Sequence, residues 1–187
     1  SHNYMFKHLE VKDGLSNNQV NAIYKDSHGF MWFGTASGLN RYDGYDTRIY
    51  RSLKDDGNSL PDSYIEDIQE DATGNLWVRT GAGYAIYNSV SDIFDRNVEG
   101  WMWHIGISGN PSTVYIDSEK IFWIYVAGKG IYCYKPGQEN AVMVAGTDTL
   151  LTEMNITDMT ECSEGILLAF GNGVLACLDR EKLNVKW

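Results

Sequence analysis

Residues 26–44 read DSHGFMWFGTASGLNRYDG, and residues 71–89 read DATGNLWVRTGAGYAIYNS. The two stretches belong to copies of one pattern that recurs at an offset of 45 positions without a gap. The identities that recur are Leu15, Asp26, Gly29, Trp32, Thr35, Gly38 and Tyr42, which return as Leu60, Asp71, Gly74, Trp77, Thr80, Gly83 and Tyr87. Self-similarity at such a period is the sequence signature of a repeat architecture.

Two weaker copies follow. In the third copy, Lys120 stands where a glycine is expected, and one residue is inserted before the next conserved glycine. That copy keeps Asp117, Trp123, Gly130 and Tyr134. The fourth copy places Leu168 in the tryptophan position, and its glycines are Gly165, Gly171 and Gly173. The repeat therefore covers most of the chain.

The first copy consists of short alternating runs separated by turn residues. The runs 20–25, 30–35, 39–42 and 45–50 have the length and alternation of β-strands. Asp43-Gly44 is a strong signal for a two-residue hairpin. Four up-and-down strands in about 45 residues form one blade of a β-propeller. The sequence predicts an all-β fold, a partial β-propeller of about four four-stranded antiparallel blades.

The repeat also predicts how the chain is divided. We expect a single partial propeller over residues 1–187, with an N-terminal outer strand in residues 1–13 and blades at residues 14–59, 60–103, 104–149 and 150–187, the last one degenerate. By the spacing of the repeat, residues 4–9 form an outer strand that has no blade of its own. Because residues 183–187 can complete the fourth blade, we expect the chain to be the first four blades of a larger ring.

The shared positions of the repeat have structural explanations. An Asp that opens a turn accepts backbone N–H groups two residues later, and the Gly after it supplies a positive φ. A Trp on the second strand fills the wedge between neighbouring blades. We therefore assign to blade structure Asp26, Gly29, Trp32, Thr35, Gly38, Asp71, Gly74, Trp77, Thr80 and Gly83.

Composition and charge exclude several functions. A formal net charge of −10 without a Lys/Arg cluster argues against binding of nucleic acid. The chain has no apolar run of the length that spans a bilayer, so we expect no membrane insertion by it. The scattered histidines share no ligand spacing, and we expect no metal, no cofactor and no catalytic residue.

The three cysteines, Cys133, Cys162 and Cys177, lie in or beside apolar runs and have no metal-binding spacing. We interpret them as small buried apolar residues. A disulfide between Cys162 and Cys177 is the alternative, and the sequence leaves it open.

The quoted motifs resemble those of a known family. Residues 14–20 (GLSNNQV), 26–35 (DSHGFMWFGT) and 38–44 (GLNRYDG) look like the two-component regulator propeller repeat. The resemblance is specific in residues 14–88, and the remaining copies are compatible with it. It implies a periplasmic sensor region of a hybrid two-component system, built from two seven-bladed propellers, with a histidine kinase and a DNA-binding response regulator downstream.

By this resemblance, the expected function is recognition of an oligosaccharide and transfer of the signal to a histidine kinase that this chain lacks. The expected partners are the oligosaccharide and the remaining blades of the parent sensor. A propeller that only docks other proteins is the alternative. A glycan-active enzyme is disfavoured, because the Asp26, Gly29 and Trp32 spacing differs from that of sialidase-like turns and no arginine cluster is present.

Departures from the repeat predict the ligand surface, since residues that break the blade pattern are free to bind. Trp101, Trp103 and His104 form such a departure before the third blade, and packing between blades is the alternative for the two tryptophans. Arg79 stands where the first copy has Gly34, and its charge can face a central channel. Open terminal blades expose strand edges, so we expect the chain to form a homodimer.

Overall fold

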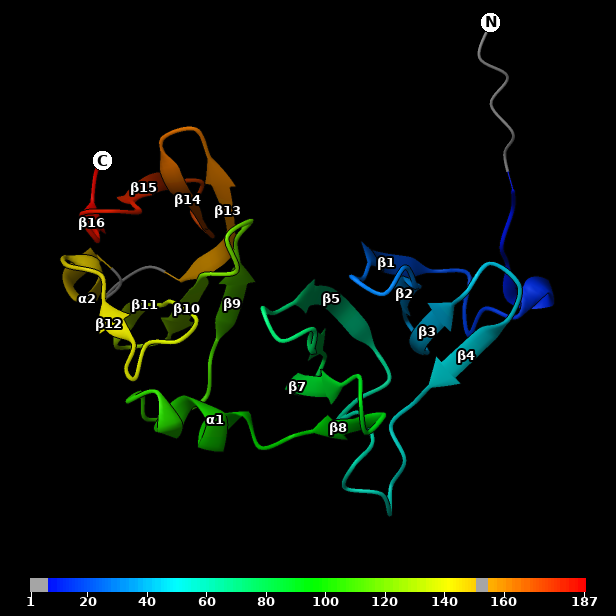
Figure 1. Ribbon diagram of the computed structural model, residues 1–187. Coiled ribbons are helices and arrows are strands. Elements are labelled where there is room, and N and C mark those ends of the chain that lie inside the picture. The colour runs from blue at the N-terminus through cyan, green and yellow to red at the C-terminus, as the bar shows by residue number, and fades with distance from the viewer. Residues whose placement is uncertain (1–6, 151–154) are drawn as a thin grey trace, which may run out of the picture. The chain divides into compact units, whose positions relative to one another are not determined.

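The computed structural model describes residues 7–150 and 155–187. Within these residues the chain forms four antiparallel sheets, each made of four consecutive strands (Figure 1). The chain divides into two compact units, the first ending at Arg96 and the second beginning at Asn97. The predicted all-β fold of four-stranded blades is confirmed, and each unit holds two blades.

The first unit contains the two strict copies of the repeat. Its first blade consists of β1 (Val20–Lys25), β2 (Met31–Thr35), β3 (Gly38–Tyr42) and β4 (Thr47–Tyr50), and its second of β5 (Ile65–Glu70), β6 (Leu76–Thr80), β7 (Gly83–Asn88) and β8 (Ile93–Asp95). The strands of the first blade lie within two residues of the bounds predicted for the first copy. The alternation of the sequence is therefore sufficient to predict them.

The second unit begins with a helix, α1 (Val98–His104), which the sequence did not predict. The third blade consists of β9 (Thr113–Ile116), β10 (Phe122–Val126), β11 (Gly130–Tyr134) and β12 (Val142–Met143). After the short helix α2 (Thr147–Leu150), the fourth blade consists of β13 (Ile156–Cys162), β14 (Gly165–Phe170), β15 (Leu175–Asp179) and β16 (Asn184–Val185). The outer strand of the fourth blade, β16, lies within residues 183–187.

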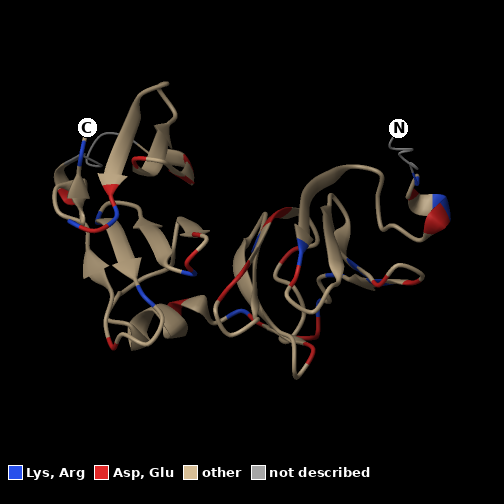
Figure 2. Ribbon diagram, turned by 45° about the horizontal axis from the view of Figure 1, so that its top comes forward, with Lys and Arg blue, Asp and Glu red and all other residues tan. Residues whose placement is uncertain are grey.

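The N-terminal outer strand predicted at residues 4–9 falls partly outside the described residues. Residues 7–10 lie in no strand, and a short 3-10 helix, η1 (Val11–Asp13), follows them. In Figure 2 most of the Lys, Arg, Asp and Glu residues lie along the turns and loops of both units.

In the turn between the first two strands of a blade, one aspartate accepts hydrogen bonds with both of its carboxylate oxygens. In the first blade, Asp26 Oδ1 accepts hydrogen bonds from the backbone N–H groups of His28 and Phe30, both at 2.9 Å. Its Oδ2 accepts one from Trp32 Nε1 at 2.8 Å. Asp71 with Trp77 and Asp117 with Trp123 repeat the indole contact at 3.2 and 3.0 Å. The aspartate thus fixes both the turn and the tryptophan.

The turn also requires a positive φ, which glycine adopts without strain. Gly29 and Gly74 have φ angles of +90° and +83°, as the sequence predicts. Lys120, which replaces the glycine in the third blade, has a φ of +64°. The third blade therefore keeps the backbone conformation of the turn although it lacks the glycine.

The repeated tryptophans are buried, as predicted. Trp32, Trp77 and Trp123 are at most 1% exposed. Trp32 packs with Ile65 of β5 in one apolar cluster, so in the first unit it fills the contact between blades. Gly34 leaves room for Ile65, because a Cβ at Gly34 would lie 2.5 Å from Ile65 Cγ2.

The fourth blade corrects one assignment. Leu167 is paired with Cys177 in the way that Trp32 is paired with Arg41. Leu167 therefore occupies the tryptophan position, and the prediction of Leu168 there is wrong. The cause is a shorter turn between β13 and β14, which shifts the second strand by one residue relative to the other blades.

Candidate functional site

The first unit has a pocket of about 450 Å³ between β4, β8 and the segment 51–59. Ligand pockets in proteins usually measure about 300–1,000 Å³. Polar and apolar side chains line it, and the accessible ones include Arg48, Arg51, Leu53, Asp56, Asn58 and Ile93. The size and the mixed lining are those of a site for a small polar ligand.

Asp92 is the centre of a hydrogen-bonded network at one wall of the pocket. Its Oδ1 accepts hydrogen bonds from the hydroxyl groups of Tyr50 and Tyr87, both at 2.6 Å. Its Oδ2 forms an ion pair with Arg48 NH2 at 2.6 Å. The Arg48 guanidinium also lies 5.0 Å from the centre of the Tyr50 ring. We call Arg48, Tyr50, Tyr87 and Asp92 the Asp92 network.

The network shifts the acidity of its members. Burial raises the pKa of the Tyr50 and Tyr87 hydroxyls, and their hydrogen bonds to Asp92 raise it further. Burial also opposes ionisation of Asp92, but the two hydroxyl donors and Arg48 outweigh it and lower the pKa of Asp92. Asp92 is therefore a carboxylate held by neutral phenols and a guanidinium, and the network has no group poised for proton transfer near neutral pH.

The second unit places apolar residues in the same positions. By strand pairing, Arg48, Tyr50, Tyr87 and Asp92 are equivalent to Val142, Val144, Leu178 and Leu183. Val144 and Leu178 belong to the core cluster of the second unit, and Leu183 packs against it. Val142 lies on β12 and pairs with Cys133 of β11. Replacing a buried polar set by apolar residues is often neutral or stabilising. The second unit forms the same pair of blades without such a network, so the Asp92 network is not a general feature of the repeat.

The backbone at Asp92 supports this comparison. Asp92 has a φ of +59°, and Leu183 at the equivalent point of the fourth blade has a φ of +51°. Both residues donate their N–H to the carbonyl four residues earlier. The left-handed backbone conformation is therefore a property of this hairpin in both units. Only the first unit has a carboxylate at this position.

Several groups at the pocket remain open to a ligand. Arg51 donates its Nε–H to the Ser37 carbonyl at 3.1 Å, and its terminal nitrogens have no partner among the described residues. The Asn58 side-chain amide likewise has no partner in the described part of the chain. Arg48 is 55% exposed at the side chain and uses NH2 for Asp92. Arginine and amide N–H groups are suited to oxygen-rich ligands.

The segment 51–59 is held in place by Arg96 at the end of the second blade. Arg96 Nε donates to the Ser59 carbonyl at 2.7 Å, and its NH2 donates to the Leu60 carbonyl at 2.9 Å. The N–H of Phe94 donates to the Asn58 carbonyl at 2.9 Å. The wall of the pocket is therefore anchored to the second blade, which makes the pocket a preformed feature of the unit.

The structure separates the two tryptophans that the sequence predicts as ligand-binding residues. Trp101 packs on the third blade, with ring centroids 5.1 Å from Phe122 and 5.7 Å from Tyr134. Trp103 and His104, on another face of α1, are exposed, with Trp103 at 71%. Trp101 thus fits the packing alternative, whereas Trp103 and His104 form an accessible surface.

Arg79 belongs to the first unit. Its Nε forms an ion pair with Glu66 Oε2 on the neighbouring strand at 3.1 Å, and its guanidinium lies 5.6 Å from the centre of the Tyr84 ring. Its side chain is 33% exposed. These contacts give Arg79 partners on its own sheet, outside the residues that line the 450 Å³ pocket.

Sequence reasoning missed the Asp92 network. A signal was present, because Arg48 and Asp92 stand where the corresponding blades of the second unit carry Val142 and Leu183. The equivalence depends on strand pairing and on hairpin length, however, and neither follows from spacing in the degenerate copies. Within the described residues no group of His, Cys, Asp and Glu is arranged to hold a metal ion.

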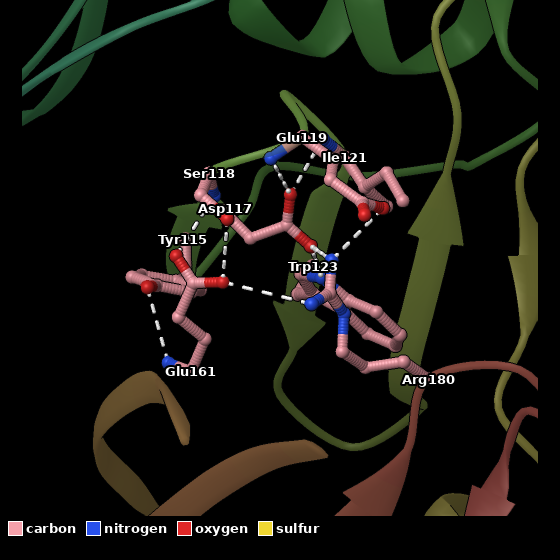
Figure 3. A network of polar contacts seen from close by, with 8 residues as sticks. All are labelled: Tyr115, Asp117, Ser118, Glu119, Ile121, Trp123, Glu161 and Arg180. Atoms are coloured by element: carbon pink, nitrogen blue, oxygen red, sulfur yellow. Dashed lines mark hydrogen bonds and ion pairs between the residues drawn. The ribbon is translucent and has the colours of Figure 1, made fainter. Parts of the chain in front are cut away.

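A second polar cluster, in the second unit, joins the third and fourth blades (Figure 3). Arg180 NH2 contacts Asp117 Oδ2 at 2.9 Å and Glu119 Oε2 at 3.1 Å, and Glu161 accepts hydrogen bonds from the N–H and hydroxyl of Ser118, both at 2.8 Å. The first unit has the same serine and glutamate pair, since Glu70 accepts from the N–H and hydroxyl of Ser27. Because the pair recurs, this cluster is a connection between blades.

Comparison with known proteins places the repeat in a family. The family model described as two component regulator propeller matches residues 14–37 and 59–82. A curated protein named histidine kinase P4, from Formosa agariphila, is 42% identical over 58 residues, which are 31% of this chain and 4% of that protein. The chain thus spans a small part of this relative.

Solved structures share the fold. The extracellular domain of a hybrid two-component system from B. thetaiotaomicron matches with a TM-score of 0.69 and 22% identity, over 96% of this chain and 26% of that one. A second such domain from the same organism matches with a TM-score of 0.55 and 17% identity, over 92% of this chain and 30% of that one. The designed protein Ika4 matches with a TM-score of 0.52 and 12% identity, over 91% of this chain and 96% of the designed chain.

The turn aspartate, the positive-φ glycine and the buried tryptophan all fall within or beside the matched residues, which begin each of the two blades of the first unit. No helix among the described residues is long and apolar enough to cross a membrane. Residues 14–37 and 59–82 are two copies of the two-component regulator propeller repeat.

Proposed function

We propose that this chain is part of an extracytoplasmic, periplasmic sensor domain that recognises an oligosaccharide and passes the signal to a histidine kinase outside the chain. The chain itself acts as a binding module and not as an enzyme. The proposal is supported by the two repeats and by the extracellular two-component domains that share the fold.

The observation that carries the proposal is the Asp92 network beside the 450 Å³ pocket. A saccharide presents hydroxyl groups that both donate and accept, and it presents apolar ring faces. Arg48, Arg51 and Asn58 supply donors, Asp56 supplies acceptors, and the exposed side chains of Leu53 and Ile93 supply apolar surface. The second unit keeps the same hairpin with apolar residues, so a binding role explains the polar choice.

The test is a thermal-shift screen of oligosaccharides of defined composition against the whole chain. A ligand that binds the folded state raises the Tm in proportion to the logarithm of its concentration above Kd. We expect at least one oligosaccharide to raise the Tm of the unmodified chain. We expect Arg48→Ala to remove the shift, because the substitution removes the exposed donor and uncouples Asp92.

The matched control is Trp103→Ala on the exposed face of α1. Its side chain is 71% exposed, so the substitution should leave folding and the pocket unchanged. A shift that survives Arg48→Ala but is lost in Trp103→Ala would move the ligand site to Trp103 and His104. Arg79→Ala is the corresponding control on β6.

The alternative function is a propeller that docks other proteins without a small ligand. Absence of any shift, both with this chain and with the complete sensor region, would favour that alternative. A response by the complete sensor region alone would place the oligosaccharide site outside this chain.

A further inference from the structure

The first blade carries three arginines on and beside its two outer strands. Arg41 of β3 is paired directly with Arg48 of β4, and Arg51 directly follows the end of β4. Like charges that face each other across two strands destabilise a sheet. By strand pairing, the equivalent residues of the third blade are Cys133, Val142 and Ala145. This concentration of positive charge is therefore not a general feature of the repeat.

Of the three arginines, Arg48 alone has a carboxylate partner among the described residues. Its NH2 forms the ion pair with Asp92 at 2.6 Å. The Arg41 guanidinium lies 4.8 Å from the centre of the Phe30 ring, and Arg51 donates to a backbone carbonyl. Neither Arg41 nor Arg51 forms an ion pair within the part of the chain that the structure describes. The rim of the first blade therefore keeps positive charge that its own carboxylates do not neutralise.

Arg51 is held at the pocket by contacts along its side chain. Its Nε donates to the Ser37 carbonyl at 3.1 Å. Its Cγ lies 3.3 Å from the point that a Cβ at Gly38 would occupy, so the glycine leaves room for the arginine. Arg51 lines the 450 Å³ pocket together with Arg48. A guanidinium whose side chain is already fixed loses less conformational entropy when it binds a ligand.

The carboxylates at the pocket are already engaged with neighbouring groups. Asp92 accepts hydrogen bonds from two tyrosine hydroxyls and pairs with Arg48. Asp56 Oδ1 accepts a hydrogen bond from the Asn58 N–H at 2.9 Å. The terminal N–H groups of Arg51 and the Asn58 amide are donors without a partner among the described residues. A guanidinium forms stronger hydrogen bonds with an anionic oxygen than with a neutral hydroxyl, so these donors favour an anionic group.

We propose that the ligand of this pocket is an acidic saccharide, whose carboxylate or sulfate group binds the guanidinium groups of Arg48 and Arg51. The Asn58 amide donates to a hydroxyl of the same sugar. Arg41 does not line the pocket, but its charge raises the positive potential at this rim. This ligand class rests on the proposed function and narrows it from oligosaccharides in general to those that carry an anionic group.

The test compares matched saccharides by thermal shift and titration calorimetry on the whole chain. The probes are trisaccharides of galacturonate, glucuronate and mannuronate, each beside its carboxyl-reduced form, and sulfated galactose trisaccharides, each beside its desulfated form. We expect at least one acidic probe to bind about tenfold or more tightly than its neutral form, which is the ratio that one charge-assisted hydrogen bond provides. Added sodium chloride should weaken the binding of the acidic probe more than that of the neutral form.

Two substitutions in the pocket should act in opposite directions. Arg51→Gln removes a positive charge and should abolish the preference for the acidic probe, while it changes the binding of the neutral form much less. Asp56→Asn removes a negative charge and keeps an oxygen that accepts from the Asn58 N–H, so it should tighten binding of the acidic probe by up to about fivefold. Arg79→Gln, on β6 and outside the pocket, is the matched control and should leave the preference unchanged.

The outcomes separate this proposal from the proposed function. Equal binding of the acidic probes and their neutral forms would overturn the acidic ligand class and leave oligosaccharide recognition intact. An acidic preference that survives Arg51→Gln and is lost in Arg79→Gln would also overturn it, because the anion would then bind outside the pocket. A preference confined to uronates or to sulfated sugars supports the proposal and identifies the anion. If no probe raises the Tm of this chain, the acidic ligand class fails, and the complete sensor region then decides the proposed function.

Discussion

At the scale of single residues, one aspartate in each of the first three blades joins the turn to the core. Asp26 uses one oxygen for the backbone of the turn and the other for the indole of Trp32. The sequence predicts the turn and the buried ring separately, from spacing. It does not predict the bond between them, because that bond depends on the rotamers of both side chains within the packed blade.

Gly34 gives a residue-scale prediction. Gly34→Ala places a Cβ against the fully buried Ile65, and overpacking of this kind costs about 1–3 kcal/mol. We expect urea denaturation to show a lower free energy of unfolding by that amount.

The matched background is Ile65→Ala, which removes the Cγ2 that the new Cβ would meet. In the Ile65→Ala background, Gly34→Ala should lower the free energy of unfolding by much less. The effects of the two substitutions on stability should therefore not be additive. Equal costs in both backgrounds would show that the close contact is not the cause.

At the scale of elements, the strands were predictable and the helix α1 was not. Strands of the first unit follow from alternation and from Asp-Gly and Ser-Gly turns. Asn97 caps the start of the helix, and its side chain accepts a hydrogen bond from the Gly100 N–H at 3.0 Å. A seven-residue helix has too few turns to show a periodic pattern, so its aromatic residues indicated only a departure from the repeat.

Arg180 gives a prediction about the contact between the third and fourth blades. Arg180→Ala leaves Asp117, whose side chain is fully buried, beside Glu161 without its cation (Figure 3). Asp117 keeps its indole and backbone donors, as Asp26 does, so we expect a loss of about 1–3 kcal/mol in unfolding free energy.

The control for this prediction is Glu119→Gln. The Glu119 side chain is 68% exposed, and its ion pair with Arg180 should contribute less than about 1 kcal/mol. If both variants lose the same stability in urea, the buried carboxylate is not what Arg180 stabilises.

The Asp92 network predicts a dependence of stability on pH. The pKa of Asp92 is lowered in the folded state, so at acid pH the unfolded chain binds the proton more readily. Its stabilisation is present above an unfolded pKa of about 3.9 and is lost as the pH falls through the lower folded pKa.

We expect Asp92→Asn to be less stable than the unmodified chain at neutral pH and to show a smaller loss of stability between neutral and strongly acid pH. Thermal unfolding over a pH series measures both. Parallel curves for the two proteins would mean that Asp92 has the same pKa in the folded and unfolded states.

At the scale of the whole chain, comparison of equivalent blades shows an exposed apolar surface on β1. The equivalent residues of β5 are buried. Val20 and Ile23 of β1 correspond to Ile65 and Ile68 of β5. The β5 residues are 0% and 4% exposed, whereas the β1 residues are 38% and 63% exposed. Sequence periodicity predicts that these positions are apolar, but it cannot show which of them are covered in this chain.

The exposed β1 residues support the expectation that the chain associates. We predict that sedimentation at increasing concentration shows dimers of the 21.1 kDa chain and that Ile23→Glu weakens them without lowering the Tm. Val90→Glu, at a side chain that is 94% exposed in a hairpin, is the control and should have no effect. A chain that remains monomeric at high concentration would contradict the prediction.

The indoles bonded to Asp26, Asp71 and Asp117 also provide spectroscopic probes, one in each of the first three blades. A buried Nε1–H bonded to a carboxylate gives a proton resonance and an exchange rate unlike those of the exposed Trp103 indole. Deuterium exchange of these three protons can therefore report the opening of each blade separately. Ligand binding at the Asp92 network should then slow exchange at Trp32 and Trp77 more than at Trp123.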